Sequence, residues 1–131
     1  MKAQAEKPPL PKPAKVNVIS RLDLSVAVSA EKYKKRLLKL SGKLARLTRR
    51  LYEKKRSLLV VFEGPDAAGK GGAIRRLTGA MDARNYQVIS IAAPSEEERA
   101  HPYLWRFWRH LPRLGRVTIF DRSWYGRVLV E

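Results

Sequence analysis

A glycine-rich segment that ends in a lysine connects an apolar run to a stretch of helical character. Residues 64–70 read GPDAAGK and fit the pattern Gly-x-x-x-x-Gly-Lys. Glycines let the backbone come close to phosphate oxygens, and successive N–H groups at the start of a helix supply positive potential. The segment predicts a phosphate-binding loop, with a ligand-free strand-to-helix turn as the alternative. Lys70 adds a full positive charge to the loop. The residues expected to bind phosphate are Gly64, Ala67, Ala68, Gly69, Lys70 and Gly71.

The loop departs from the general pattern at Gly71, which stands where a Ser or Thr hydroxyl normally coordinates Mg²⁺. A metal ion would then need another ligand. Asp66 lies inside the loop, and Mg²⁺ prefers hard carboxylate oxygens together with substrate phosphates. We therefore expect Asp66 to bind Mg²⁺. The structural alternative is that Asp66 caps a turn after Pro65, as Asp often does.

A second carboxylate, Asp121, ends the apolar run 117–120. An Asp at the C-terminal end of a buried strand lies where α/β sheets bind ligands, which predicts a second Mg²⁺ contact. Arg122 follows directly, and Arg127 lies one turn along a helix that Ser123 would cap. Phosphoryl transfer needs positioning and charge neutralisation, which two arginines beside a metal-binding Asp would supply. Taken alone, each arginine fits a simple surface position equally well.

The elements that must position these side chains are short. Apolar runs predict strands at 57–64, 87–91 and 116–121, and apolar spacing predicts helices at 70–81 and 103–111, with a loop at 94–100. The alternation of strand and helix indicates right-handed βαβ units. The predicted fold class is α/β, with a parallel sheet and helices on both of its faces.

The chain before the first strand divides into two parts. Residues 1–28 hold four of the eight prolines and predict a flexible Pro-rich tail. Residues 29–56 predict a basic amphipathic helix capped by Ser29, with twelve bases against Glu31 and Glu53. This helix either packs with a solvated charged face or offers a surface to polyanions. Its apolar face is formed by Tyr33, Leu37, Leu40, Leu44, Leu47 and Leu51.

Bulk composition narrows the classes of partner. The 131 residues include 28 Lys and Arg against 12 Asp and Glu, a formal charge of +16 that concentrates polyanions. Nucleic acid, an anionic membrane and inorganic polyphosphate all satisfy this charge, and so does a surface that only keeps the protein soluble. The sequence has no cysteine, which excludes disulfides and thiolate metal sites, and its two histidines make a poor metal site. It also lacks a long apolar span and a secretory signal, so we expect a cytoplasmic protein without a membrane partner.

Three longer blocks carry a family resemblance. The loop GPDAAGKGG, the block PYLWRFWRHLP and the strand end IFDRSWYGRVLVE resemble the polyphosphate kinase 2 family, and the likeness covers residues 24–131. The family resemblance implies a P-loop kinase-like fold that moves phosphoryl groups between polyphosphate and a nucleotide with Mg²⁺. It implies that Asp66 and Asp121 hold metal and engage the acceptor, while Lys70 and the loop amides bind phosphate. Arg122 and Arg127 would contact the phosphate chain or the acceptor phosphate.

Two further stretches refine the expected acceptor. FEGPDAAGKGGAIRRLTGAMDARNY and IAAPSEEERAHPYLWRFWR are similar to the branch of the family that phosphorylates AMP to ADP. The block from Tyr103 to Leu111 would then flank the nucleotide, although large aromatics such as Trp105 and Trp108 at helical spacing are more often core residues. The alternatives are an ATP-dependent nucleotide kinase and a basic nucleic-acid-binding module, the latter without a recognised reading motif. A homo-oligomer is compatible with all three.

The likeness also sets an expectation for a chain of this length. Members of the family continue beyond the Asp-Arg-Ser-Trp-Tyr block with further strands and a basic helical lid, whereas this sequence ends at Glu131. We expect residues 57–131 to be the N-terminal half of a P-loop phosphotransferase domain. With three strands and no lid, residues 1–131 alone are expected to aggregate or be partly disordered, to bind polyphosphate weakly and to lack measurable transfer activity.

Overall fold

The computed structural model of the protein describes residues 22–23 and 25–129, so most of the predicted tail at 1–28 lies outside the described residues. The described chain forms three strands, five α-helices and a 3₁₀ turn at Ala83–Asn85. Every helix in this part is too short or too polar to cross a lipid bilayer. In order, the elements are α1 (Ala30–Glu53), β1 (Leu58–Phe62), α2 (Lys70–Thr78), β2 (Tyr86–Ser90), α3 (Glu96–Arg99), α4 (Trp105–Trp108), β3 (Val117–Asp121) and α5 (Trp124–Arg127).

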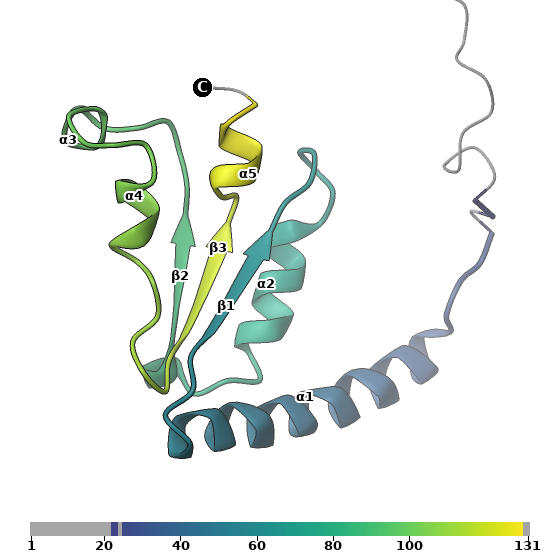
Figure 1. The fold of residues 1–131 in the computed structure, drawn as a ribbon. Coiled ribbons are helices and arrows are strands. Elements are labelled where there is room, and N and C mark those ends of the chain that lie inside the picture. The colour runs from purple at the N-terminus through teal and green to yellow at the C-terminus, as the bar shows by residue number, and fades with distance from the viewer. Residues whose placement is uncertain (1–21, 24, 130–131) are drawn as a thin grey trace, which may run out of the picture.

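The three strands form one parallel sheet in the order β1-β3-β2 (Figure 1). The first residue of β3, Val117, pairs with Leu58 of β1 and Tyr86 of β2, and the last, Asp121, pairs with Phe62 and Ser90. All three carboxyl ends therefore meet at one edge of the sheet. This edge is where parallel α/β sheets bind ligands, because the loops that leave the strands converge there.

Side chains of the central strand alternate between two apolar cores, as the two-residue period of a strand requires. Val117 and Ile119 pack with Ile74 of α2 on one face. Phe120 packs with Phe107 of α4 and with Ile91 on the other face. Helices thus cover both faces of a parallel sheet, as the sequence predicted. Ile119 and Phe120 are fully buried, so truncating either to Ala would cost about 2–5 kcal/mol of unfolding free energy.

Helix α1 begins after Ser29, whose hydroxyl accepts a hydrogen bond from the Lys32 N–H. It runs along one end of the molecule, and its N-terminal part extends away from the sheet (Figure 1). Its C-terminal end is attached more closely, because Tyr52 lies against Gly115, where an added Cβ would come within 3.3 Å of that ring. Gly115 also has a φ of 76°. Both the close contact with Tyr52 and the backbone conformation therefore favour glycine at this position.

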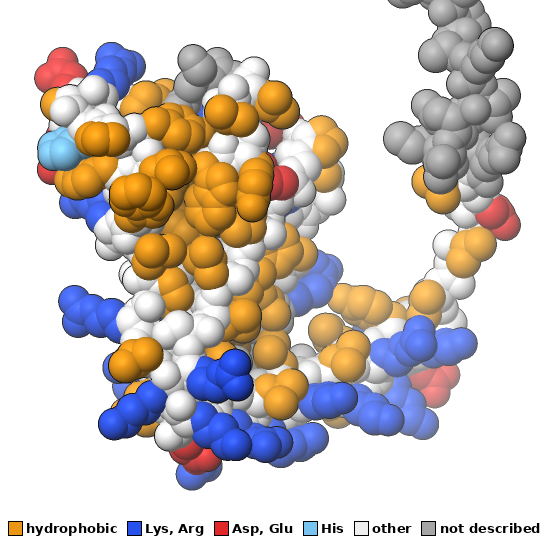
Figure 2. Space-filling view, viewed as in Figure 1, with side chains coloured by type: hydrophobic (Ala, Val, Ile, Leu, Met, Phe, Trp, Pro, Cys, Tyr) orange, Lys and Arg blue, Asp and Glu red, His pale blue; other side chains and the backbone are white. Residues whose placement is uncertain are grey.

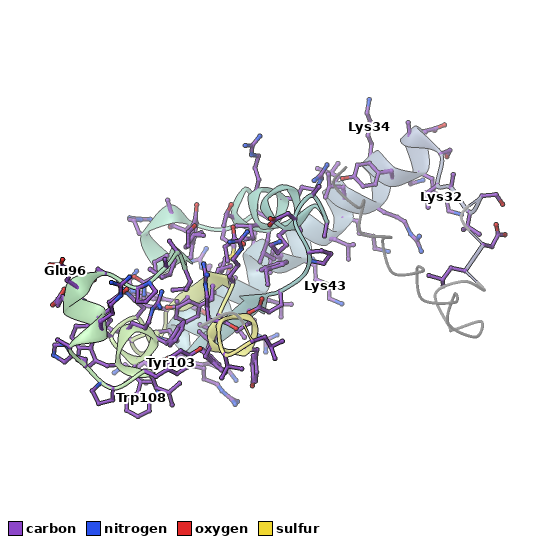
Figure 3. The ribbon with its side chains drawn as sticks, turned by 90° about the horizontal axis from the view of Figure 1, so that it is seen from above. Lys32, Lys34, Lys43, Glu96, Tyr103 and Trp108 are labelled. Atoms are coloured by element: carbon purple, nitrogen blue, oxygen red, sulfur yellow. The ribbon has the colours of Figure 1, made fainter. Side chains whose placement is uncertain are left out.

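Two predictions between β2 and β3 were wrong. The segment 94–100, predicted as a loop, contains α3, which starts with a capping box between Ser95 and Glu98. The helix predicted at 103–111 is reduced to the single turn α4. Its aromatic residues are not uniformly core either, because Phe107 is fully buried whereas 59% of Trp108 is exposed. Trp108 lies at the outer edge of the molecule (Figure 3).

Candidate functional site

A cleft of about 450 Å³ opens at the edge of the sheet where the carboxyl ends of the strands meet. The predicted phosphate-binding loop forms one wall, and the ends of β2 and β3 form the other. Four of the five side chains predicted to do chemistry meet here, although they come from segments more than fifty residues apart. The lining residues are Asp66, Ala67, Ala68, Gly69, Lys70, Gly71, Ser90, Ile91, Asp121 and Arg122.

The loop between β1 and α2 adopts a conformation that its glycines permit. Gly64 and Gly69 have positive φ angles of 149° and 87°, and Ala67 joins them in the left-handed region at 62°. Gly69 caps α2, so the unpaired N–H groups of the first helical turn lie at the end of the helix that borders the cleft. The partial positive charge of this helix end suits an anion.

Lys70 is the first residue of α2, and its side chain folds back over the loop. Its Nζ donates hydrogen bonds to the carbonyl oxygens of Gly64 and Pro65, at 2.8 and 2.9 Å. The ammonium group is therefore held at the mouth of the loop by two backbone acceptors. A full positive charge thus lies beside the N-terminus of α2. The ammonium group and the helix dipole both attract an anion bound in the loop.

Asp66 and Arg122 join the two walls of the cleft. Arg122 Nη2 donates to Asp66 Oδ1 at 2.6 Å, although 88% of the Asp66 side chain is exposed. The Arg122 backbone has a φ of 67°, and its N–H donates to the Phe62 carbonyl at 2.9 Å. A non-glycine residue in this region is uncommon, and such strain is characteristic of functional sites.

Glu63, which the sequence analysis did not select, connects the loop to the segment after β3. Its Oε1 accepts hydrogen bonds from the Ser123 hydroxyl at 2.6 Å and from the Gly126 N–H at 3.2 Å. Burial alone would raise the pKa of Glu63, but these donors and the charge of Lys70 together hold it below its ordinary value. The carboxylate form of Glu63 therefore fixes the turn that follows Asp121.

Arg127, the fifth predicted residue, lies beside the cleft and not in it. Its Nη2 donates to the carbonyl oxygen of Ile91 at 3.0 Å. Together with Glu63, Asp66 and Arg122 it lines a neighbouring cleft of about 310 Å³, which Gly64 and Pro65 also border. Ser123 caps α5 as predicted, because its hydroxyl accepts from the Tyr125 N–H.

The aromatic block from Tyr103 to Leu111 supports the site from behind. The side chains of this block do not line the 450 Å³ cleft among the described residues. Tyr103 instead donates its hydroxyl to the Trp124 carbonyl at 2.9 Å. The buried Arg106 pairs with Glu98 at 3.5 Å and donates to the Ala92 carbonyl, which fixes the chain just after β2. Trp105 stacks on His101 with centroids 3.9 Å apart.

Three lining or linking residues were missed by the sequence analysis, although a signal for them existed. Ser90, Ile91 and Glu63 each lie at or just after the end of a strand. The rule that selected Asp121, a polar residue at the carboxyl end of a parallel strand, also applies to Ser90 and Glu63. What the sequence did not give was the strand order that brings β1 and β2 to either side of β3.

The cleft offers carboxylates to a hard cation but not a complete cage. Asp66 and Asp121 both line it. Within the described residues, no group of three or more His, Cys, Asp or Glu side chains lies close enough together to hold a metal ion. A cation held here would therefore take its remaining ligands from water or from a bound phosphate compound.

Comparison with known proteins identifies the family to which the chain is related. Residues 27–131 match the sequence profile of the family Polyphosphate kinase 2. The chain is 57% identical over 114 residues to a polyphosphate:AMP phosphotransferase of Pseudomonas aeruginosa, and 38% identical over 117 residues to ADP-polyphosphate phosphotransferase 2 of Rhizobium meliloti. These alignments cover 87% and 89% of this chain, but 23% and 38% of the two relatives.

A solved structure shares the fold of the chain. The crystal structure of a polyphosphate kinase 2 from Pseudomonas aeruginosa superimposes with a TM-score of 0.79 at 57% identity, covering 87% of this chain and 25% of that one. The described fold, with its small parallel sheet and flanking helices, is thus shared with an experimental structure. The family profile extends over most of the sequence, including the loop and both carboxylates. The chain belongs to the polyphosphate kinase 2 family.

Proposed function

We propose that this chain supplies the phosphate-binding half of a P-loop kinase-like phosphotransferase, which moves a phosphoryl group from inorganic polyphosphate to AMP and gives ADP. The observation that carries the proposal is the convergence of Lys70, Asp66, Asp121 and Arg122 around one 450 Å³ cleft. The acceptor assignment is supported by similarity, since the AMP-using relative is 57% identical and the ADP-using relative 38%.

The reaction is an exchange of one phosphorus–oxygen bond for another. A phosphate oxygen of AMP forms a bond to the terminal phosphorus of the polyphosphate chain, and the bond from that phosphorus to the next bridging oxygen breaks. The products are ADP and a chain one phosphate shorter. Because the transferring group carries dispersed negative charge, catalysis depends on positioning and on fixed positive groups.

The described side chains supply those groups. Lys70 and the amides at the start of α2 bind the oxygens of the donor phosphate in this proposal. Arg122 faces the same cleft from the other wall, and Arg127 borders the adjoining cleft, where the acceptor phosphate would lie. Arginine suits both positions because its planar fork binds two phosphate oxygens at once.

Mg²⁺ fits the donor set of the cleft. Asp66 and Asp121 would hold it, and the replacement of a loop hydroxyl by Gly71 makes these two carboxylates the principal protein ligands. The ion would neutralise phosphate charge during transfer. Without the ion, Asp66 pairs with Arg122 at 2.6 Å, which keeps the Asp66 carboxylate at the cleft wall. On binding Mg²⁺, Asp66 would replace this contact by one to the ion.

The test uses a chimera, since the chain matches 23% of the length of its Pseudomonas aeruginosa relative. In this chimera the aligned part of the present chain replaces the matching segment of that relative, over 114 residues. Transfer is measured with polyphosphate or ATP as donor and AMP or ADP as acceptor. The expected result is fastest turnover with polyphosphate and AMP. Faster turnover with ATP would contradict the donor, and faster turnover with ADP would contradict the acceptor.

A further inference from the structure

A basic cleft lies at the end of the sheet opposite the candidate active site. It has a volume of about 270 Å³, and four arginines line it together with apolar and amide side chains. We call it the arginine cleft, and its members are Arg84, Tyr86, Gln87, Arg109, Leu111, Arg113, Arg116 and Val117. Tyr86 and Val117 are the first residues of β2 and β3, whereas the candidate active site contains Ser90 and Asp121 at their last positions. At ~3.3 Å per residue, about 13 Å of strand separates the two clefts.

The arginine cleft has no carboxylate in its lining. Two of its arginines do have acidic partners at the rim, since Arg84 pairs with Asp82 at 2.8 Å and Arg109 with Glu97 at 3.5 Å. Across the described part of the chain, Arg113 and Arg116 are not in ion pairs with any carboxylate. Hydrogen bonding to Arg84, with added attraction from Arg84 and Arg116, lowers the pKa of Asp82 to about 2. The positive potential here therefore exceeds what the nearby acids neutralise.

Helix α1 continues this positive surface. The Ser57 hydroxyl donates to the Arg113 carbonyl at 2.8 Å, and the Arg116 guanidinium lies 5.6 Å from the centre of the Tyr52 ring. These contacts hold the C-terminal end of α1, and the exposed Lys54, Lys55 and Arg56 that follow it, beside the arginine cleft. Lys and Arg side chains accordingly gather along one end of the molecule, over α1 and the adjoining strand ends (Figure 2).

We propose that the arginine cleft and the adjoining end of α1 form a second docking site for the polyphosphate chain, distant from its reacting end. Arginine forks match phosphate oxygens, and an evenly charged chain gains from a line of separate contacts. A ligand held at two places dissociates less readily, because release at one leaves the other bound. The identity of the polyanion rests on the proposed function, whereas the existence of the site rests on the cleft itself.

The experiment measures binding of long-chain polyphosphate and of tripolyphosphate to the 131-residue chain at several salt concentrations. The test variant is Arg84→Gln with Arg113→Gln, because both side chains are exposed and a surface pair such as Arg84–Asp82 contributes little to folding. The matched control is Arg75→Gln with Arg99→Gln, two exposed arginines outside both clefts. Circular dichroism and thermal melting establish that each variant is folded.

The test variant is expected to bind long chains about tenfold more weakly, with the slope of log affinity against log salt reduced by about 1 to 2. Its affinity for tripolyphosphate, which is too short to reach both clefts, should change much less. The control should keep most of the long-chain advantage. Equal losses in test and control variants would overturn the proposal, because a general charge field would then explain binding. A single-stranded RNA that binds as tightly, with the same loss in the test variant, would also overturn it in favour of a nucleic-acid surface.

The chimera separates this inference from the proposed function. If it transfers phosphoryl groups from polyphosphate while the test variant binds long chains normally, only the second docking site is wrong. If the chimera does not use polyphosphate but the test variant loses long-chain affinity selectively, the docking site stands and the donor assignment fails.

Discussion

Lys70 contacts its own loop, but other residues determine the loop's backbone conformation. Its ammonium group bonds to two carbonyls of its own loop, while the left-handed residues Ala67 and Gly69 shape the loop backbone. Lys70→Ala should therefore leave the fold intact and remove the charge beside the N-terminus of α2. In the chimera we expect turnover to fall by about 10²–10³-fold, as for other preorganised charge contacts. Arg75→Ala on the exposed side of α2 is the control, and near-normal turnover of the Lys70 variant would remove the loop from the mechanism.

The two carboxylates of the cleft differ in their surroundings, but both are expected to bind Mg²⁺. Asp66→Asn and Asp121→Asn should each raise the Mg²⁺ concentration needed for half-maximal transfer, or eliminate transfer. Asp82→Asn is a matched control, because Asp82 pairs with Arg84 and lies outside the cleft. Titration with Mn²⁺, followed by electron paramagnetic resonance, reports metal binding independently of turnover. An unchanged metal requirement in both variants would show that the ligands lie elsewhere.

At the scale of elements, the contact between Glu63 and Gly126 fixes α5 against the end of β1. A Cβ at residue 126 would lie 2.6 Å from Glu63 Oε2, so in Gly126→Ala the carboxylate must shift, which weakens the hydrogen bonds that its Oε1 accepts. We expect a loss of about 1–3 kcal/mol in unfolding free energy, from hydrogen bonds to a charged group. In the double variant Glu63→Ala/Gly126→Ala the clash is gone, so the two costs should not add. Additive costs in denaturant titrations would show that the contact is not made.

The same carboxylate predicts a pH dependence of stability. The folded-state pKa of Glu63 is lower than its ordinary value of 4.5, so the folded chain favours the ionised form. Its stabilisation is therefore fully present above pH 4.5 and is lost as the pH falls through the lower folded-state value. The difference in Tm between the native chain and Glu63→Gln should shrink below that pH. A difference for Glu63→Gln that stays constant as the pH falls would contradict the assignment.

The elements also show what the sequence alone could predict. Each strand contains a run of β-branched and other apolar residues, which is why all three were located correctly, although only β3 is buried on both faces. The capping box that starts α3 was legible in Ser95 and Glu98, but the acidic segment between them favoured a loop. The length of α4 was overestimated because the helical spacing of apolar residues continues past it to Leu111. Only Phe107 of that series is fully buried. Local patterns predicted which residues were apolar, but not which of them find a packing partner.

The site shows the same division between local and non-local information. The loop from Gly64 to Lys70 is a contiguous motif whose glycines are dictated by its own backbone, so the sequence predicts it directly. The pairing of Asp66 with Arg122 spans 56 residues and depends on β3 lying next to β1. Arg127 was grouped with Arg122 by its position in the chain, whereas in the fold its guanidinium turns towards the Ile91 carbonyl.

On the scale of the whole molecule, a strong positive charge opposes a large apolar surface. A groove of about 510 Å³ between α1 and α2 is lined by leucines, two of which, Leu40 and Leu47, are 61% and 49% exposed. Burial of such a surface favours association at roughly 25 cal/mol per Å². The formal charge of +16 opposes it, since two copies repel each other over a distance set by the ionic strength.

Salt should decide between these two forces. The screening length falls from about 30 Å at 0.01 M to about 3 Å at 1 M salt, while apolar attraction does not weaken. We therefore expect the chain to be monomeric at low salt and to self-associate reversibly as salt rises, as measured by sedimentation velocity. Leu40→Gln with Leu47→Gln should suppress this association. Leu38→Gln is the matched control, because Leu38 is 78% exposed on the same helix but does not line the groove. Stronger association at low salt, or equal suppression by the Leu38 variant, would show that this groove is not the surface that joins the copies.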